Sequence, residues 1–402
     1  MKKKVAIIGG GIGGLTLAKE LVSRDISVDV YEKGKNLGGL LAGFPLGKSQ
    51  LELAYHHIFK SDSEVLSLIK ELGLEKKMLW IESSIGIHDG KRIQPFMGAM
   101  DLLRFKGLDI VSKIRLGLVA LWLGFDNKWE KYEKVSAAEW MEKYCGKKGY
   151  EVIWRPLLQG KFNKEYKKVS MAWLWARIHT RSSSKEKNGK EYLGYIKGGF
   201  ENLVAKMEKD LRKKGVKFFL GKEVEIKEIE KKYDRVIYTG ALSEVDYLGA
   251  LGIVFESEES LSPYYWHNIN DLESPFLAFI QQTNLIDKKE YRNKHVYYMG
   301  SYLSQDDKRF EMKEGELYNL YFDYLKKLFP SFERRKVSFK KIFKFKTAQH
   351  LVKMGYKVPK SKMSEKVYRM NFAQIYPEDR GINFAVREGR KMAKTIRDSF
   401  ES

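Results

Sequence analysis

Cysteine is almost absent from this sequence of 402 residues, which contains a single one, Cys145. One cysteine cannot form an intramolecular disulfide, and it leaves no cysteine cluster for a metal ion or an iron–sulfur centre. We therefore expect a reducing compartment, with the cytoplasm as the default location, and no metal site.

Long apolar segments are also missing, because no stretch reaches the roughly 18 apolar residues that a membrane-spanning helix needs. The segment from Met1 to Ala18 has a charged start and an apolar stretch, but five of the six residues from Gly9 to Gly14 are glycine. So many glycines would disrupt the helix of a signal peptide, and we expect no cleaved leader here. Internal repeats and low-complexity linkers are absent as well.

The composition is that of a folded, water-facing chain, with 43% hydrophobic and 31% charged residues. Its length exceeds what one hydrophobic core usually organises, so we expect two connected domains. The formal net charge of +22 would attract nucleic acid, anionic lipid or an acidic substrate. The competing interpretation is a set of solvated lysine-rich helix faces. The sequence shows no pattern of a DNA-recognition helix or of an aromatic RNA-binding surface, so nucleic acid is the least favoured partner.

A glycine loop near the start follows an apolar, β-branched run at residues 4–8 and precedes a helical pattern at residues 15–22. A second strand is expected at residues 27–31. The segment from the first strand to the second spans about 30 residues, which is the length of a unit in which a helix connects two parallel strands. In this context, the Gly-x-Gly-x-x-Gly pattern at residues 9–14 predicts a dinucleotide-binding loop.

Each glycine of the pattern has an expected role. Gly9 permits the tight turn, Gly11 lets a pyrophosphate approach the backbone, and Gly14 allows the helix to pack on the strand. The helix start then offers N–H groups to the phosphates. Glu32, at the end of the second strand, would accept both ribose hydroxyls and repel a 2′-phosphate, which disfavours NADP. The alternative is a glycine-rich turn beside a surface glutamate.

Further segments carry a family resemblance. Gly38-Gly39 follows Glu32 closely, and characteristic stretches occur at residues 195–203, 215–224, 233–239 and 371–389. With these motifs the sequence resembles the superfamily of flavin amine oxidases, protoporphyrinogen oxidases and phytoene desaturases, to which the UDP-galactopyranose mutases are also similar. The resemblance implies FAD as the cofactor. It also implies an α/β fold, in which a Rossmann-like FAD-binding domain of the glutathione reductase type accompanies a substrate domain of mixed sheet and helices.

The resemblance, together with the glycine loop, gives a set of cofactor-binding residues. In the family, the position of Val224 holds the adenine edge by its backbone, and we expect this residue in a strand at residues 224–229. The final strand, loop and helix lie beside the flavin in relatives. Two departures concern Leu40, where many members have arginine, and Gln374, near which many have aspartate. The full predicted set is Gly9, Gly11, Gly13, Gly14, Glu32, Lys33, Gly38, Gly39, Leu40, Val224, Gln374, Gly381, Ile382 and Asn383.

The domain organisation implied by these segments is discontinuous. The FAD-binding domain would comprise residues 1–60, 194–246 and 346–402. The substrate domain would comprise residues 61–193, a helical insertion, and 247–345, a mixed sheet.

Residues for the chemistry are harder to assign, because a flavin itself supplies the electron chemistry. His56 and His57 belong to a segment that passes over the flavin in relatives, where they would act as acid or base or contact the ring. The alternative is that one packs and the other caps a loop. In the helical insertion, Arg155, Trp175 and Arg177 are candidates for a substrate pocket, with helix packing and surface arginines as the alternative. His350, which precedes the last FAD segment, is a further candidate for substrate binding.

Apolar residues at helical spacing from Leu108 to Phe125, with Lys113 and Arg115 nearby, predict either a buried helix or a helix lying on an anionic membrane surface. A peripheral position on the inner face of the membrane is therefore an alternative to a purely cytoplasmic one. The expected function is oxidation or desaturation of a small organic substrate by hydride transfer to flavin N5, with a quinone or O2 as acceptor; lipophilic compounds are among the expected substrates. The alternatives are a non-redox mutase acting on a nucleotide sugar and a flavin-binding scaffold without turnover.

Overall fold

The computed structural model describes residues 2–186 and 189–401 and divides into two compact units. Unit 1 comprises Met1–Trp80, Gly194–Glu244 and Lys357–Ser402, and unit 2 comprises Ile81–Leu193 and Val245–Tyr356. Four residues inside the expected domain boundaries lie outside the described part: Met1, Lys187, Asn188 and Ser402.

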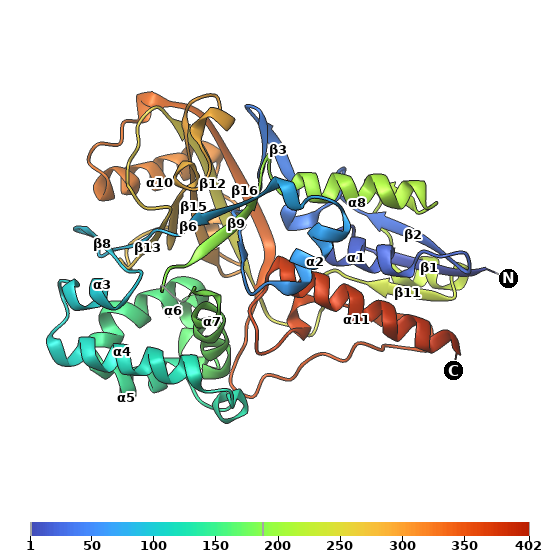
Figure 1. Cartoon of the computed structure of the whole chain (residues 1–402), viewed down its shortest axis with the longest axis horizontal. Coiled ribbons are helices and arrows are strands. Elements are labelled where there is room, and N and C mark those ends of the chain that lie inside the picture. Colours follow the sequence, from blue (N-terminus) through green and yellow to red (C-terminus); the bar gives the residue numbers. More distant parts are fainter. Residues whose placement is uncertain (1, 187–188, 402) are drawn as a thin grey trace. The chain divides into compact units, whose positions relative to one another are not determined.

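Unit 1 is built on a five-stranded sheet of order β10-β2-β1-β11-β17, in which every pair is parallel (Figure 1). Parallel strands covered on both faces are apolar throughout, and the central strand β1 has Val5, Ala6 and Ile7 completely buried. The strands are β1 (Lys3–Ile8), β2 (Ile26–Glu32), β10 (Lys217–Leu220), β11 (Arg235–Tyr238) and β17 (Val367–Arg369).

Helices cover one face of this sheet, and an aromatic cluster covers the other. Ile7 faces helix α1, whereas its neighbour Ala6 packs with Tyr31, Ile229 and Tyr233, because successive side chains of a strand alternate between faces. Helix α1 has α8 and α11 as neighbours, and α11 also contacts α2 (Figure 1). The helices are α1 (Ile12–Leu21), α2 (Ser63–Glu71), α8 (Glu201–Lys213), α9 (Ile226–Ile229) and α11 (Ile382–Glu401).

Two small sheets complete the description of this part of the chain. A hairpin pairs β3 (Gly43–Leu46) with β4 (Ser49–Glu52). A three-stranded sheet has the order β5-β9-β6 and consists of β5 (Ile58–Phe59), β6 (Met78–Glu82) and β9 (Tyr192–Ile196).

Unit 2 contains a seven-stranded sheet of order β16-β12-β15-β14-β13-β7-β8. All neighbouring pairs are antiparallel except β13 and β7, which run parallel. The predicted α/β fold with a mixed sheet is therefore confirmed. The strands are β7 (Ile85–His88), β8 (Ile93–Pro95), β12 (Tyr247–Ser257), β13 (Trp266–Ile269), β14 (Ala278–Gln281), β15 (His295–Leu303) and β16 (Val337–His350).

Helix α10 (Glu314–Leu328) packs on this sheet through an aromatic core in which Phe255, Phe279 and Tyr321 are fully buried. The other helices of unit 2 follow one another between residues 99 and 184. They are α3 (Ala99–Arg104), α4 (Ile110–Phe125), α5 (Ala137–Gly149), α6 (Arg155–Phe162) and α7 (Met171–Ser184). Among the helices of the described residues, none is long and apolar enough to cross a membrane.

One predicted element is wrong. The strand expected at residues 224–229 is the one-turn helix α9, because the side chains of Glu225 and Glu228 form a capping box that begins a helix. The first helix also begins earlier than predicted, at Ile12 instead of residue 15.

Candidate functional site

The carboxyl ends of the parallel strands in unit 1 bring the glycine loop and Glu32 together. Gly9 has a φ of 115°, which favours glycine, and its N–H donates to the carbonyl of Tyr31 over 2.8 Å. The Glu32 carboxylate accepts from the N–H of Gly10 and from the N–H of Gly34, both over 2.7 Å. Each carboxylate oxygen has further lone pairs, so Glu32 can order the loop and still accept a hydroxyl.

Helix α1 begins without a partner for its first N–H groups. Gly11 is the N-cap residue and has no side chain, and the first turn contains no acidic residue. Within residues 2–186 and 189–401, the N–H groups of Ile12, Gly13 and Gly14 have no acceptor, and the first bond runs from Leu15 N to Gly11 O. A helix start of this kind attracts an anion through its free N–H groups and its dipole.

Gly14 and Gly11 lack side chains for different reasons. A Cβ on Gly14 would lie 2.2 Å from Gly9 O and 3.4 Å from Ile7 Cγ2, so this glycine lets α1 pack on β1. Gly11 has an ordinary φ of −70°, and no protein atom lies within 4 Å of the position of its missing Cβ. The backbone does not require glycine there, and the missing side chain leaves open space beside the helix start.

A second helix begins next to α1. The position of a Cβ on Gly13 lies 3.3 Å from Ala385 O in the first turn of α11, and a Cβ on Gly389 would lie 2.8 Å from Gly13 O. The two glycines therefore allow α1 and α11 to run closely side by side (Figure 1). The N-termini of both helices consequently meet near the glycine loop.

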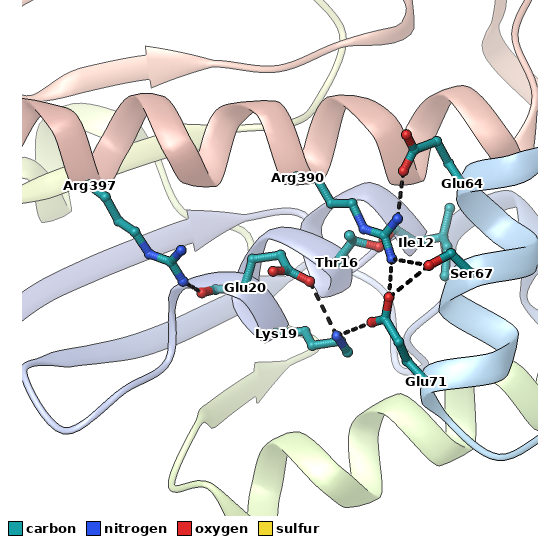
Figure 2. Close-up of polar contacts among 9 residues, drawn as sticks. All are labelled: Ile12, Thr16, Lys19, Glu20, Glu64, Ser67, Glu71, Arg390 and Arg397. Atoms are coloured by element: carbon teal, nitrogen blue, oxygen red, sulfur yellow. Dashed lines mark hydrogen bonds and ion pairs between the residues drawn. The ribbon is translucent and has the colours of Figure 1, made fainter.

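Polar side chains hold α1, α2 and α11 together beyond this contact (Figure 2). Arg390 of α11 pairs with Glu64 over 2.6 Å and with Glu71 over 2.5 Å, both on α2. Lys19 of α1 also reaches Glu71 over 2.5 Å, so one carboxylate receives a cation from each of the other two helices. Arg397 donates to the backbone carbonyl of Glu20 at the end of α1. The network fixes the alignment of the helices whose first turns lie at the glycine loop.

Val224 lies in a loop that is connected to the end of β2. Lys222 N donates to Glu32 O over 3.0 Å, and Gly221 N donates to Gly34 O over 2.8 Å. In the described part of the chain, the N–H and C=O of Val224 have no hydrogen-bond partner. The half-buried Val224 side chain packs on the aromatic cluster of Tyr31 and Tyr233.

That cluster has its own hydrogen bonds. The hydroxyl groups of Tyr31 and Tyr233 lie 2.8 Å apart, and Tyr233 donates to Asp29 over 2.7 Å. The Tyr31 ring also stacks on Phe219 with centroids 4.7 Å apart. The Val224 loop thus rests on a rigid aromatic support.

The second glycine pair packs between the glycine loop and α8. Gly38 and Gly39 have φ values of 107° and 58°. Gly38 N donates to Gly10 O over 2.8 Å, and a Cβ on Gly38 would lie 3.2 Å from Val204 Cγ2 of α8. Leu40 is half-buried, whereas Lys33 is exposed.

Two of the predicted cofactor residues have hydrogen-bond partners within the chain, and their contact with a cofactor stays a prediction. Gln374 donates to Pro359 O and to Ser361 Oγ and accepts from Asn371 N over 2.7 Å, so both ends of its amide are engaged in the loop. Asn383 accepts from Glu64 N and from Val65 N and thereby caps the start of α2. Gly381 and Ile382 mark the start of α11, where Ala385 N donates to Gly381 O.

Glu52 begins the segment that contains the two predicted histidines, and sequence reasoning did not single it out. Only 1% of its surface is exposed, and it accepts from Phe200 N over 2.6 Å and from the Tyr195 hydroxyl over 2.8 Å. Burial raises the pKa of Glu52 to about 7, although both hydrogen bonds oppose this shift. The available signal was an acidic residue between two leucines, Leu51 and Leu53, which is an unusual place for a charge.

The two predicted catalytic histidines follow Glu52 along the chain, and both are half-buried. His56 Nδ1 lies 2.6 Å from Ala54 O. Burial of the ring, with the nearby Arg380 guanidinium, lowers the pKa of His56 to about 4, although the bond to Ala54 opposes the shift. A carbonyl oxygen only accepts, so the neutral ring carries its proton on Nδ1 and leaves Nε2 as an acceptor. The His57 ring packs edge-on against Phe59 with centroids 5.1 Å apart.

The candidates for substrate binding all lie in unit 2. Trp175 is buried, and its Nε1 donates to Asp126 O over 2.7 Å. Arg177 is exposed with its guanidinium over the Trp173 ring, and Arg155 pairs with Glu151 over 2.6 Å. These contacts match the helix-packing interpretation more closely than a pocket.

His350 is also in unit 2 and is fully buried near the end of β16, where its ring lies 5.7 Å from that of Tyr356. Its role in substrate binding stays a prediction.

Comparisons with known proteins agree with these local features. A family model described as flavin containing amine oxidoreductase matches residues 12–275. Coproporphyrinogen III oxidase of Staphylococcus aureus is 24% identical over 281 residues, which cover 61% of this chain and 59% of that protein. Zeta-carotene desaturase of Solanum lycopersicum is 35% identical over 79 residues, or 19% of this chain and 13% of the desaturase. The matched parts therefore span 59% and 13% of these two relatives, less than two thirds of either.

Solved structures resemble the whole chain at low identity. A protein of Exiguobacterium sp. 255-15 assigned as a protoporphyrinogen oxidase has a TM-score of 0.74 with 16% identity and 100% of each chain covered. Reduced UDP-galactopyranose mutase has a TM-score of 0.75 with 13% identity, covering 99% of this chain and 94% of the other. A putrescine oxidase variant has a TM-score of 0.72 with 14% identity and 99% of each chain covered. At these identities the likeness concerns the fold.

Proposed function

This chain belongs to the family of flavin-containing amine oxidoreductases, and from this premise we propose that it binds FAD in unit 1 and oxidises a small organic substrate. Unit 1 would be the FAD-binding domain and unit 2 the substrate domain. The observation that carries the FAD proposal is the open space at Gly11, where the backbone does not require glycine and a side chain would occupy the position proposed for the pyrophosphate.

The neighbouring groups fit the parts of FAD in order. The unpartnered N–H groups at the start of α1 would bind the pyrophosphate. Glu32 would accept the ribose hydroxyls with the lone pairs that its loop bonds leave. The N–H and C=O of Val224 would meet the polar edge of the adenine. The first turn of α11, with Gly381 and Ile382, would place its positive end toward the flavin ring.

Bound FAD would supply the redox chemistry, accepting a hydride from the substrate at N5 and later passing two electrons to O2 or a quinone. The residues of the chain would position the substrate and handle its proton. Neutral His56, with Nε2 as an acceptor, can take the proton that the substrate loses when it also loses a hydride. His57, the next residue, is the second candidate for this role.

Gly11→Ala tests the cofactor site. The φ of −70° suits alanine and no protein atom is near the new Cβ, so the variant should fold with unchanged thermal stability in the apo form. It should lose FAD, since the methyl group occupies the proposed position of the pyrophosphate. The matched control is Gly315→Ala in α10, which also has nothing within 4 Å of its Cβ. Retention of FAD at the wild-type ratio by Gly11→Ala would refute the placement.

The reaction is tested by mixing the purified protein anaerobically with porphyrinogens, isoprenoids, amines or UDP-sugars and recording the flavin absorbance. Bleaching by one of the oxidisable classes, reversed by O2 or a quinone, supports an oxidoreductase. The net charge of +22 also suits an anionic nucleotide sugar. A requirement for reduced flavin with conversion of a UDP-sugar and no net electron transfer would show the mutase reaction instead. Flavin binding without bleaching or conversion in any class would leave the scaffold function.

His57→Ala tests the catalytic assignment separately from the cofactor. We expect this variant to retain FAD and to lose turnover with whichever compound bleaches the flavin of the wild type in the anaerobic assay. His56→Ala should behave likewise if the Nε2 atom takes the substrate proton. Unchanged turnover in either variant removes that histidine from the mechanism.

A further inference from the structure

Helix α4 in unit 2 has one buried face and one exposed face, and both are apolar. The buried face contains Leu116, Val119 and Leu123. The exposed residues include Ile110, Ile114, Leu118, Leu121, Trp122 and Phe125, and 81% of the Phe125 surface is accessible. At about 100° per residue, the exposed apolar residues occupy an arc of about 120° on the helix. We call this arc, together with the exposed Met100 and Leu103 of α3, the apolar face.

Helix α3 extends this face. Leu102 lies in van der Waals contact with the position of a Cβ on Gly117, and Lys113 Nζ donates to Leu103 O over 2.7 Å. Exposed apolar side chains that gather on two contacting helices form a contiguous patch, and such a patch marks an interaction site rather than ordinary surface.

Charge distinguishes between the kinds of partner. Helix α4 contains no acidic residue, and its only charged residues are Lys113 and Arg115. On the same helical projection these two cations lie on opposite sides of the exposed arc, each within about 60° of its edge. An apolar arc of Leu, Ile, Trp and Phe with a cation on each side is the pattern of a helix that lies in the plane of an anionic lipid surface.

We propose that the apolar face docks on a membrane containing anionic lipid, with α4 parallel to the bilayer plane. The exposed apolar side chains between Ile110 and Phe125 enter the boundary between headgroups and acyl chains. Lys113 donates to Leu103 O and Arg115 to the carbonyls of Lys143 and Tyr144, and the N–H donors that these bonds leave reach the phosphates. A second copy of this chain fits less well. A symmetric contact through this face would bring the cations of two strongly positive chains together. The proposal is independent of the oxidoreductase function and of its substrate.

Vesicle co-sedimentation of the full chain tests the proposal. At low salt, the wild type should bind vesicles of equal parts phosphatidylglycerol and phosphatidylcholine, and bind phosphatidylcholine vesicles more weakly. Leu121→Glu should weaken binding by about tenfold or more. The control Leu320→Glu changes another exposed leucine, on α10, and should bind as the wild type does. Equal flavin content and thermal stability establish that each variant is folded.

A fluorescent label reports the orientation. Cys145 is fully buried, and burial raises the pKa of its thiol to about 12, so the wild-type chain should resist thiol reagents. Phe125→Cys and Leu320→Cys can therefore be labelled selectively with an environment-sensitive dye. Vesicles should shift the emission of the dye at position 125 to shorter wavelength and leave that at position 320 unchanged.

Four results would overturn the proposal. They are no binding of the wild type to the phosphatidylglycerol vesicles, equal binding to both vesicle types, wild-type affinity in Leu121→Glu, and a dye shift at position 320 but not at 125. A wild-type dimer that Leu121→Glu converts to a monomer, without vesicle binding, would assign the face to a second copy.

Discussion

The buried carboxylate of Glu52 makes the stability of this protein depend on pH in a direction opposite to that of most acidic residues. The folded chain holds the Glu52 proton more tightly than the unfolded chain, because burial raises its pKa from 4.5 to about 7. Between these two values the folded state binds more protons, so stability falls as pH rises. Below about pH 4.5 the contribution is fully present, and above about pH 7 it is lost.

The isosteric change Glu52→Gln isolates this effect. Glutamine keeps the oxygen that accepts from Phe200 N, and its amide can donate to the Tyr195 hydroxyl, whose partner is now an uncharged group. Each unit of pKa difference corresponds to about 1.4 kcal/mol. A pKa difference of about 2.5 units therefore corresponds to about 3 kcal/mol. Between about pH 4.5 and about pH 7.5, the free energy of unfolding of Glu52→Gln should rise by this amount relative to that of the wild type.

Urea denaturation followed by circular dichroism at a series of pH values measures this gain, because the comparison of two chains under one condition cancels the common pH dependence. Glu75→Gln, which removes an exposed carboxylate of unit 1, is the control for the loss of one negative charge. A difference between Glu52→Gln and wild type that stays flat, or that grows as the pH falls, would refute the reasoning. It would show that the hydrogen bonds, and not burial, determine the charge of Glu52.

Three further changes test the framework around the cofactor site. Gly14→Ala should lower the free energy of unfolding by about 2 kcal/mol or more, because its Cβ meets backbone that cannot move aside; a melting temperature equal to that of the wild type would contradict this. Arg390→Met removes partly exposed ion pairs and should cost about 0.5–1 kcal/mol at low ionic strength and less in high salt. A loss that is independent of salt would assign the effect to packing instead. Tyr233→Phe removes the hydroxyl that links Tyr31 to Asp29 and should raise the dissociation constant of FAD in a chain that still folds; fluorescence titration with an unchanged constant would show that the support under Val224 does not need this bond.

Local sequence determined the parts of the fold that depend on neighbours along the chain. An apolar run, a glycine loop and a helical pattern predicted the strand, turn and helix at the start, because each signal is contained in a few consecutive residues. The helix α9 carried a local signal as well, since Glu225 and Glu228 have the spacing of a capping box. We expected a strand at residues 224–229, and the capping box starts a helix there instead.

Tertiary structure decided what each side chain does. Gly11 and Gly14 belong to one motif, but only their surroundings show that one is in tight contact and the other beside open space. The contact of Asn383 with the cofactor stays a prediction, but its side chain caps α2, whose backbone lies more than 300 residues earlier in the chain. Such a pairing leaves no pattern in a single sequence.

The same holds for charge and exposure. The sequence alone predicted the strand, the glycine loop and the helix at the start of unit 1, because that motif is contained in consecutive residues. It did not determine that Glu52 is buried, or that one apolar face of α4 is covered while the other is open, because helical periodicity is the same for both faces. Burial depends on which distant elements pack against a residue, and only the folded chain brings those elements together.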